Sequence, residues 1–278
     1  LFRSLSIPNS VLSINSDILG ILGQCKNLAA INVDNENPHY SADDGVLFNK
    51  DKTSLILYPV AKENATYNIP SSVNTIEKDA FANCNSLNAV NIPDSVTSIG
   101  NQAFIMCENL NSVTIPNSVT SIGEGAFFDC TGLHTINIPT GVTSIESGVF
   151  QGAGLTSVTI PAGVTNIKDV AFSECEQLKT VVIPDSVTEI GYKAFVNCDS
   201  LTDVYYGGSE TQWNAISINE NDNGTAALKK ATIHYNSTGP VEEKKNIQNT
   251  EVTGVQESYT YTGGAITPEV VVKDGSST

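Results

Sequence analysis

Apolar residues recur at the same positions of a repeated unit between Ile69 and Leu201. Ile-Pro pairs begin at Ile69, Ile92, Ile115, Ile138, Ile160 and Ile183, so the unit is 23 residues long and one copy is a residue shorter. Self-similarity at this period is typical of solenoids, in which each repeat packs only against its neighbours. The sequence therefore predicts a repeat solenoid.

Each unit contains two segments with different periodicity. The Val-x-Ile-Pro segment alternates, which predicts a short strand with its β-branched residues in the core; its ladder should end at the proline, which has no N–H to donate. The segment Ala-Phe-x-x-Cys-x-x-Leu has helical spacing over about two turns, which predicts a short α- or 3₁₀-helix. In one copy the apolar positions are Ile115, Val119, Ile122, Ala126, Phe127, Cys130, Leu133 and Ile136.

A single unit is too small to fold alone. Ordering its backbone costs about 1–2 kcal/mol per residue, which is more than the burial of its roughly eight apolar side chains returns. Neighbouring copies must therefore stack about 4.8 Å apart and share one core. We expect Phe104, Phe127 and Phe172 to lie in a single column.

The outward positions of the predicted strands form two columns of mostly small polar side chains. The candidate surface consists of Asn91, Thr114, Asn137, Thr159 and Tyr205 in one column and Ser112, Thr135, Ser157 and Thr180 in the other. Hydroxyl and amide groups donate and accept hydrogen bonds, so this face suits a protein or glycan ligand. The alternative is that these side chains only solvate an open sheet.

The six cysteines share one position of the unit, which Ala153 fills in the shortened copy. They are Cys25, Cys84, Cys107, Cys130, Cys175 and Cys198. Identical placement predicts a column of buried thiols that fill the core. Disulfides and a metal site are the alternatives, but the chain has no C-x-x-C and only three histidines.

Sequence patterns of common catalytic sites are missing. The chain has no G-x-S-x-G, H-E-x-x-H, G-x-x-x-x-G-K-[ST] or G-x-G-x-x-G, so we predict no catalytic residues, no cofactor and no metal site. Cys130 and His134 are close enough in sequence to form a nucleophile–base pair. We do not expect this pair, because the thiol should face the core and the imidazole the solvent.

The chain of 278 residues has a formal net charge of −16. This charge disfavours nucleic acids and anionic membrane surfaces as partners. No apolar run approaches the roughly 18 residues of a membrane-spanning helix, so we predict no membrane insertion.

Two segments depart from the repeat. Residues 34–68 form an insert in which Val46–Phe48 and Leu55–Tyr58 flank a polar turn, which predicts a hairpin. Residues 202–235 follow the last regular unit and should cap the solenoid, whose end would otherwise expose its core and strand edge.

Within the predicted cap, Ser209 and Gln212 have the spacing of a capping box, which predicts a short helix through Trp213 and Ile216. A closing strand is expected at residues 231–235. Stacking of a carbohydrate on Tyr205, Tyr206, Trp213 and Tyr235 is an alternative role for these aromatic residues.

The unit I-P-x-S-V-T-x-I-G-x-x-A-F-x-x-C-x-x-L resembles the BspA-type leucine-rich repeat of bacterial surface proteins, and the resemblance covers residues 1–235. It implies a right-handed curved stack of leucine-rich-repeat type. It also implies adhesion to host or bacterial surface components, and a cell-surface or extracellular location. The chain begins at Leu1 within a repeat, so we expect it to be part of a longer protein whose signal sequence lies elsewhere.

Residues 236–246 have the composition of a linker. The segment ESYTYTGGAITPEVVVKDGSS that follows resembles the opening strands of a bacterial immunoglobulin-like domain. The resemblance implies an all-β tail at residues 247–278, truncated because a sandwich needs about seven strands.

Repeat solenoids offer extended surfaces more than deep pockets. We therefore expect a non-catalytic binding or adhesion module that presents its repeated surface to an extracellular protein or glycan. The alternative is a structural stalk or spacer within a larger surface enzyme or scaffold protein.

Overall fold

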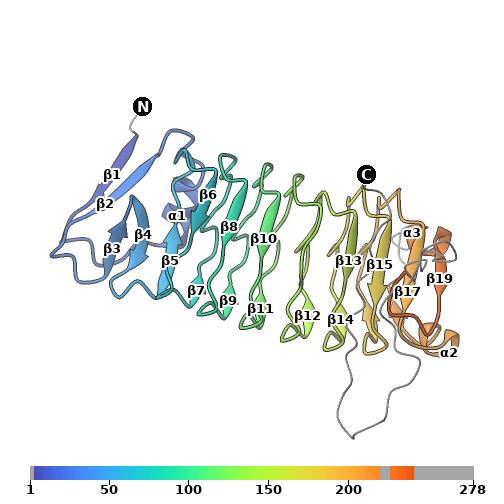
Figure 1. Cartoon of the computed structure of the whole chain (residues 1–278). Helices are drawn as coiled ribbons and strands as arrows, with labels where there is room; N and C mark the ends of the chain where they lie inside the picture. Colours follow the sequence, from blue (N-terminus) through green and yellow to red (C-terminus); the bar gives the residue numbers. More distant parts are fainter. Residues whose placement is uncertain (1–2, 220–225, 241–278) are drawn as a thin grey trace, which may run out of the picture. The chain divides into compact units, whose positions relative to one another are not determined.

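Parallel strands from successive repeats stack side by side along one axis, as the repeat predicts (Figure 1). The computed structural model describes residues 3–219 and 226–240. The stack belongs to one compact unit, Leu1–Gly239. The predicted immunoglobulin-like segment, residues 247–278, and the linker beyond residue 240 lie outside the described residues.

The strands predicted from the Val-x-Ile segments form two parallel sheets. The first contains β6 (Thr66–Asn68), β8 (Ala89–Asn91) and β10 (Ser112–Thr114), and the second contains β13 (Ser157–Thr159), β15 (Thr180–Ile183), β17 (Asp203–Tyr206) and β19 (Thr232–His234). In β10, Val113 is buried whereas Ser112 and Thr114 are exposed. The alternation therefore buries the β-branched residues, and in the regular units the strands end before the proline, as predicted.

A second set of parallel strands lies on another side of each coil, where no strand was predicted from the sequence. It comprises β7 (Thr75–Ile76), β9 (Ser98–Ile99), β11 (Ser121–Ile122), β12 (Ser144–Ile145), β14 (Asn166–Ile167), β16 (Glu189–Ile190) and β18 (Ser217–Ile218). Most are Ser-Ile or Thr-Ile pairs whose isoleucine is buried. Two residues are too few for a visible alternation in the sequence.

The third side of each coil, its corner, is a series of turns where the spacing predicted a short helix. Its N–H groups alternate between two directions. Ala82 N donates within its coil to Asp79 O at 3.0 Å, whereas Phe81 N donates to Ala103 O of the next coil at 2.7 Å. This alternation places Asp79 (φ 58°) and Asn83 (φ 60°) in the left-handed region. The helical expectation is wrong because bonds to the next coil replace those of a helix.

The corner packs a column of aromatic rings and a column of thiols in the core. The rings of Phe81, Phe104, Phe127, Phe150, Phe172 and Phe195 stack with successive centroid distances of 4.8, 5.2, 5.8, 5.5 and 5.2 Å. Cys84, Cys107, Cys130, Cys175 and Cys198 are buried and free, as predicted, while Cys25 is half-buried. The single column expected for the phenylalanines is therefore confirmed.

The strand side of the stack is interrupted between β10 and β13 (Figure 1). Residues 135–137 form no strand, although a strand was predicted there, and β11 does not pair with β12. The corner stays continuous, since Phe127 N donates to Val149 O of the next coil at 2.8 Å. The interruption precedes the corner of the shortened copy, and there the ring spacing is widest.

The N-terminal end is more irregular than its sequence indicated. It contains β1 (Ser4–Ile7), α1 (Ser16–Leu22), β2 (Ala30–Val33), β3 (Tyr40–Asp43), β4 (Val46–Asn49) and β5 (Ser54–Leu57). The predicted hairpin is present as antiparallel β4 and β5, and β3 adds a further strand. Because β5 pairs in parallel with β7, the insert extends the sheet that contains β7, β9 and β11.

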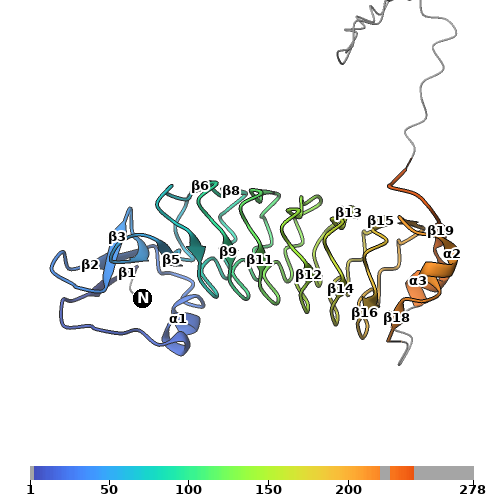
Figure 2. The same ribbon diagram turned by 90° about the horizontal axis from the view of Figure 1, so that it is seen from below.

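The C-terminal end is capped as predicted. Ser209 and Gln212 form the capping box of α2 (Glu210–Trp213), which ends earlier than expected, and α3 (Ala226–Lys230) follows. The closing strand is β19, which pairs in parallel with β17. The helix α1 lies at one end of the stack and the two cap helices at the other (Figure 2).

Candidate binding surface

The outward side chains of β6, β8, β10, β13, β15, β17 and β19 define what we call the strand face. Asn91, Ser112, Thr114, Ser157 and Thr159 are exposed on it, and Thr180 and Tyr205 are half-buried. Strand pairing aligns Thr114 with Asn91, and Thr159 with Val182. The structure thus brings the predicted residues together in two groups, on either side of the interruption.

The first group is an uncharged ladder of amides and hydroxyls. The Asn91 amide Nδ2 donates to Asn68 Oδ1 at 2.6 Å, which links β8 to β6 through their side chains. Asn68 was not among the predicted residues, although its exposed position in register with Asn91 places it in the same column. Extending the alignment of the repeats by one unit toward the N-terminus would have identified Asn68 as a member of this column.

Asn137 and Thr135 do not occupy the strand position expected of them. Both are exposed, but the Asn137 amide turns back to the preceding coil. Its Nδ2 donates to Ile115 O at 2.6 Å, and its Oδ1 accepts from Ile115 N at 3.1 Å. The side chain therefore replaces backbone pairing at the interruption, and the strand face is divided here.

The second group carries aromatic rings and a carboxylate. The ring of Tyr205 stacks on His234 at 4.5 Å and 11°, and His234 Nε2 lies 2.7 Å from Asp203 Oδ1. The hydrogen bond with His234, together with one from Thr202, lowers the pKa of Asp203. His234 covers one face of the Tyr205 ring, and Val182 lies next to Tyr205 in the adjacent strand. This tyrosine is therefore poorly placed to stack on a sugar.

The other cap aromatics serve the core. Tyr206 is buried and the half-buried Trp213 packs edge-on against it at 5.2 Å. These contacts favour capping over the alternative of carbohydrate stacking.

Most acidic groups of the central coils have no cation nearby in the sequence, although Glu146 pairs with Lys168. Residues 80–167 contain five carboxylates and no lysine or arginine. Burial, together with Glu174 and Glu108 nearby, raises the pKa of Asp129 at the corner. Within the described residues no group of His, Cys, Asp and Glu side chains is arranged to hold a metal ion.

The structure does not bring Cys130 and His134 together as a nucleophile and base. The Cys130 thiol is buried and donates to Phe104 O, whereas His134 Nδ1 lies 3.0 Å from Gly154 O. Burial raises the pKa of the Cys130 thiol well above its usual value.

Among the helices described, none is long and apolar enough to cross a membrane.

Comparison with known proteins identifies the repeat. The family described as BspA type Leucine rich repeat region matches residues 61–169 and 143–223 in six copies, more than half of the chain. The chain therefore belongs to this family of leucine-rich repeat proteins. No curated protein matches it.

Solved structures of bacterial leucine-rich repeat proteins have the same fold. A leucine-rich repeat protein from Eubacterium ventriosum is 33% identical with a TM-score of 0.68, over 72% of this chain and 54% of that one. A leucine rich cell surface protein from Faecalibacterium prausnitzii is 36% identical with a TM-score of 0.56, over 77% and 50%. The pneumococcal vaccine antigen PcpA, 20% identical with a TM-score of 0.52 over 84% and 56%, shares the fold. The chain spans about half the length of these proteins.

Proposed function

We propose that this chain is a non-catalytic binding module of a secreted or cell-surface bacterial protein, and that it contacts an extracellular protein or glycan through the strand face. The observation that carries the proposal is the uncharged ladder of β6, β8 and β10. There, exposed amides and hydroxyls occupy successive strands in register. Such a ladder offers many weak contacts at fixed spacing, which suits multipoint binding to an extended ligand.

The family and its solved members support a surface location. The Faecalibacterium prausnitzii relative is described as a cell surface protein. The resemblance of residues 257–277 to an immunoglobulin-like domain would fit a spacer in such a protein.

A structural stalk or spacer is the second candidate function. It is favoured by the continuous aromatic column, which runs through the corner even where the strands are interrupted. A stalk needs this continuity but no ligand on the strand face.

The test compares two faces of one stack. The variant T114R/T159R places two bulky cations on the strand face. The matched control S121R/T143R places the same charge on another side of the stack, at the exposed Ser121 of β11 and the exposed Thr143 next to β12. We expect binding to a glycan array, or to a protein captured from cell-surface extracts, to be lost in T114R/T159R and kept in the control. Equal binding by both variants would exclude the strand face as the site.

A further inference from the structure

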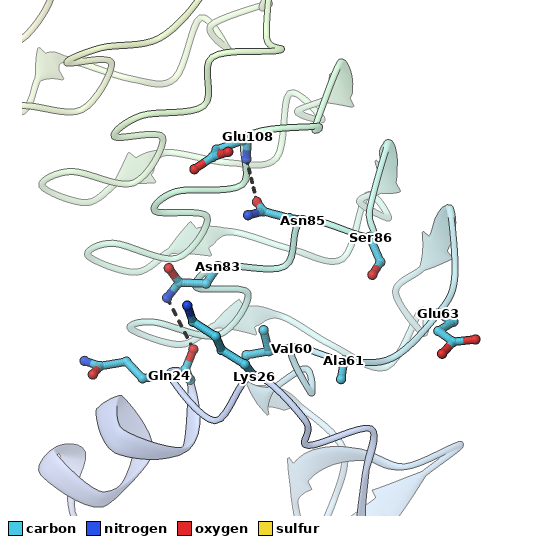
Figure 3. Close-up of a pocket in the computed structure, with 10 residues that line it drawn as sticks. Gln24, Lys26, Val60, Ala61, Glu63, Asn83, Asn85, Ser86 and Glu108 are labelled. Carbon is cyan, nitrogen blue, oxygen red and sulfur yellow. Dashed lines mark hydrogen bonds between the residues drawn. The ribbon is translucent and has the colours of Figure 1, made fainter. Parts of the chain in front are cut away.

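An open hollow lies near the C-terminal end of α1, and its lining includes no residue of the strand-face ladder (Figure 3). It is an open groove of about 750 Å³, within the roughly 300–1,000 Å³ of ligand-binding pockets. Val60 and Ala61 form part of its lining, together with residues from the α1 side and from the corner that follows.

The groove is bordered by the end of α1 on one side and by the coil of residues 82–86 on the other, with the coil of residues 60–63 between them. Asn83 Nδ2 donates to Gly23 O at 3.3 Å, and a Cβ atom at Gly23 would lie 3.6 Å from the Ala82 Cβ. The end of α1 is therefore held against the coil of residues 82–86. The coil between them contributes the small side chains of Val60 and Ala61 and the exposed side chain of Glu63 to the lining of the groove.

Several polar groups of the walls have unused bonding capacity. No partner for the side chains of Gln24, Lys26 and Ser86 occurs among the described residues. The Asn85 Oδ1 accepts from Glu108 N at 2.8 Å, which holds the backbone of Glu108 and leaves its carboxylate unpaired there. Lys26 reaches from the α1 side toward the Asn83 side (Figure 3). The groove thus combines free amide, ammonium and hydroxyl groups with the free carboxylate of Glu108. The other carboxylate of its lining, Glu63, forms an exposed ion pair with Arg3 at 3.4 Å.

This combination selects one class of ligand. A phosphate is disfavoured because the carboxylates of Glu63 and Glu108 both line the groove and the whole chain has a formal net charge of −16. A sugar would lack an aromatic ring to stack on, since none lines the groove. Peptide groups, by contrast, match the whole amide of Gln24 and the amide groups that the internal bonds leave open, Asn83 Oδ1 and Asn85 Nδ2.

We propose that this groove binds an extended peptide segment of a partner protein, with a lysine or arginine of that segment beside Glu108, or beside Glu63 in place of Arg3. Charge-assisted bonds to these carboxylates supply specificity, and the negative charge of the chain attracts a basic segment. The site is separate from the strand-face ladder, so the proposal does not rest on the function proposed above.

The test uses a phage-displayed library of random linear heptapeptides, panned against the full chain. We expect enriched peptides to contain lysine or arginine, and their synthetic forms to bind E63K/E108K about tenfold or more weakly than the wild type, by fluorescence anisotropy. The control D94K/E124K makes the same charge change at exposed positions outside the groove and should bind as the wild type does. T114R/T159R should also retain peptide binding, which separates this site from the strand face.

Failure to enrich any peptide would overturn the proposal, as would equal binding by E63K/E108K and the wild type. Loss of binding in D94K/E124K as well as in E63K/E108K would show a general charge effect and also contradict it. An A61W variant, which fills the groove without changing charge, should bind about tenfold or more weakly if its circular dichroism matches the wild type. Neutral oligosaccharides that bind the wild type but not A61W would assign the groove to glycans instead.

Discussion

The thiol of Cys130 donates a hydrogen bond to the backbone carbonyl oxygen of Phe104, 3.1 Å away in the preceding coil. Cys107, Cys175 and Cys198 make the equivalent bond to Phe81, Phe150 and Phe172 at 2.9, 3.0 and 3.0 Å. The thiols therefore tie their coils to the preceding ones as well as filling space, except in the shortened copy, where Ala153 stands at this position. To form a disulfide, two of these thiols would have to lose their hydrogen bonds to the backbone carbonyl groups.

Burial makes these thiols unreactive. It raises the pKa of Cys107 and of Cys198 to about 12, and those of Cys84, Cys130 and Cys175 well above the usual value. Because the thiolate is the reactive form, we expect Ellman's reagent to modify only the half-buried Cys25 rapidly in the folded chain, and all six cysteines after denaturation. The C25A variant should show no rapid phase. Rapid reaction of a second thiol would contradict the buried column.

Gly123 lies too close to the preceding coil for any side chain. A Cβ atom there would be 2.5 Å from Asn101 N and 2.7 Å from the Gly100 carbonyl carbon, so the backbone would have to move. We expect G123A to lower the free energy of unfolding by about 1–3 kcal/mol. The control is G163A, whose Cβ would lie no closer than 3.3 Å to Thr140 O. Urea unfolding that gives both variants the same stability would refute the close approach.

Val170 is a β-branched residue in the left-handed region, at φ 50°. Gly125 and Gly148 occupy the same corner position in earlier coils at φ 60° and 59°. Because glycine has no Cβ to strain there, we expect V170G to raise the free energy of unfolding by about 1 kcal/mol. V170A keeps a Cβ and should gain less. A lower melting temperature for V170G than for V170A would contradict the assignment of strain.

The Asp79 carboxylate is costly to the fold at neutral pH. Burial raises its pKa, and the ammonium of Lys78, 3.9 Å away, offsets this only in part. A raised pKa means that the folded chain binds this proton more tightly than the unfolded chain. The stability from Asp79 is therefore present at acid pH and is lost as the pH rises through the folded pKa.

D79N should remove this dependence, since asparagine is neutral and tolerates the left-handed backbone at this position. We expect it to stabilise the chain by up to about 1 kcal/mol at pH 7 and to have less effect at pH 4. Thermal unfolding at the two pH values measures the difference. Equal effects at both would show that desolvation of Asp79 is not the cause.

Much of the fold was predictable because it depends on burial within one unit. The Ile-Pro period, the Phe104 and Phe127 column and the capping box of Ser209 each need only local spacing. The hairpin of the insert followed from two apolar runs around a polar turn. In each case the local sequence pattern and the tertiary environment favour the same structure.

The corner and the interruption were not predictable in this way. Phe81 bonds to Ala103 of the next coil, and no pattern within a single unit reveals such a bond. The I-N-I segment at residues 136–138 alternates like the other strand segments, so the sequence did not reveal that Asn137 turns back to Ile115 there. The groove beside α1 arises from segments distant in sequence, so its residues carried no common signal.

The central claim is that equivalent residues of successive coils form one linear, outward-facing array. The most direct measurement is the distance between spin labels in a C25A background, with one label at position 68 and the other at 159, 182 or 205. With one coil per strand spacing along this column, we expect separations of about 19, 24 and 29 Å. Separations that do not increase in equal steps would contradict the array, and with it the proposed binding face.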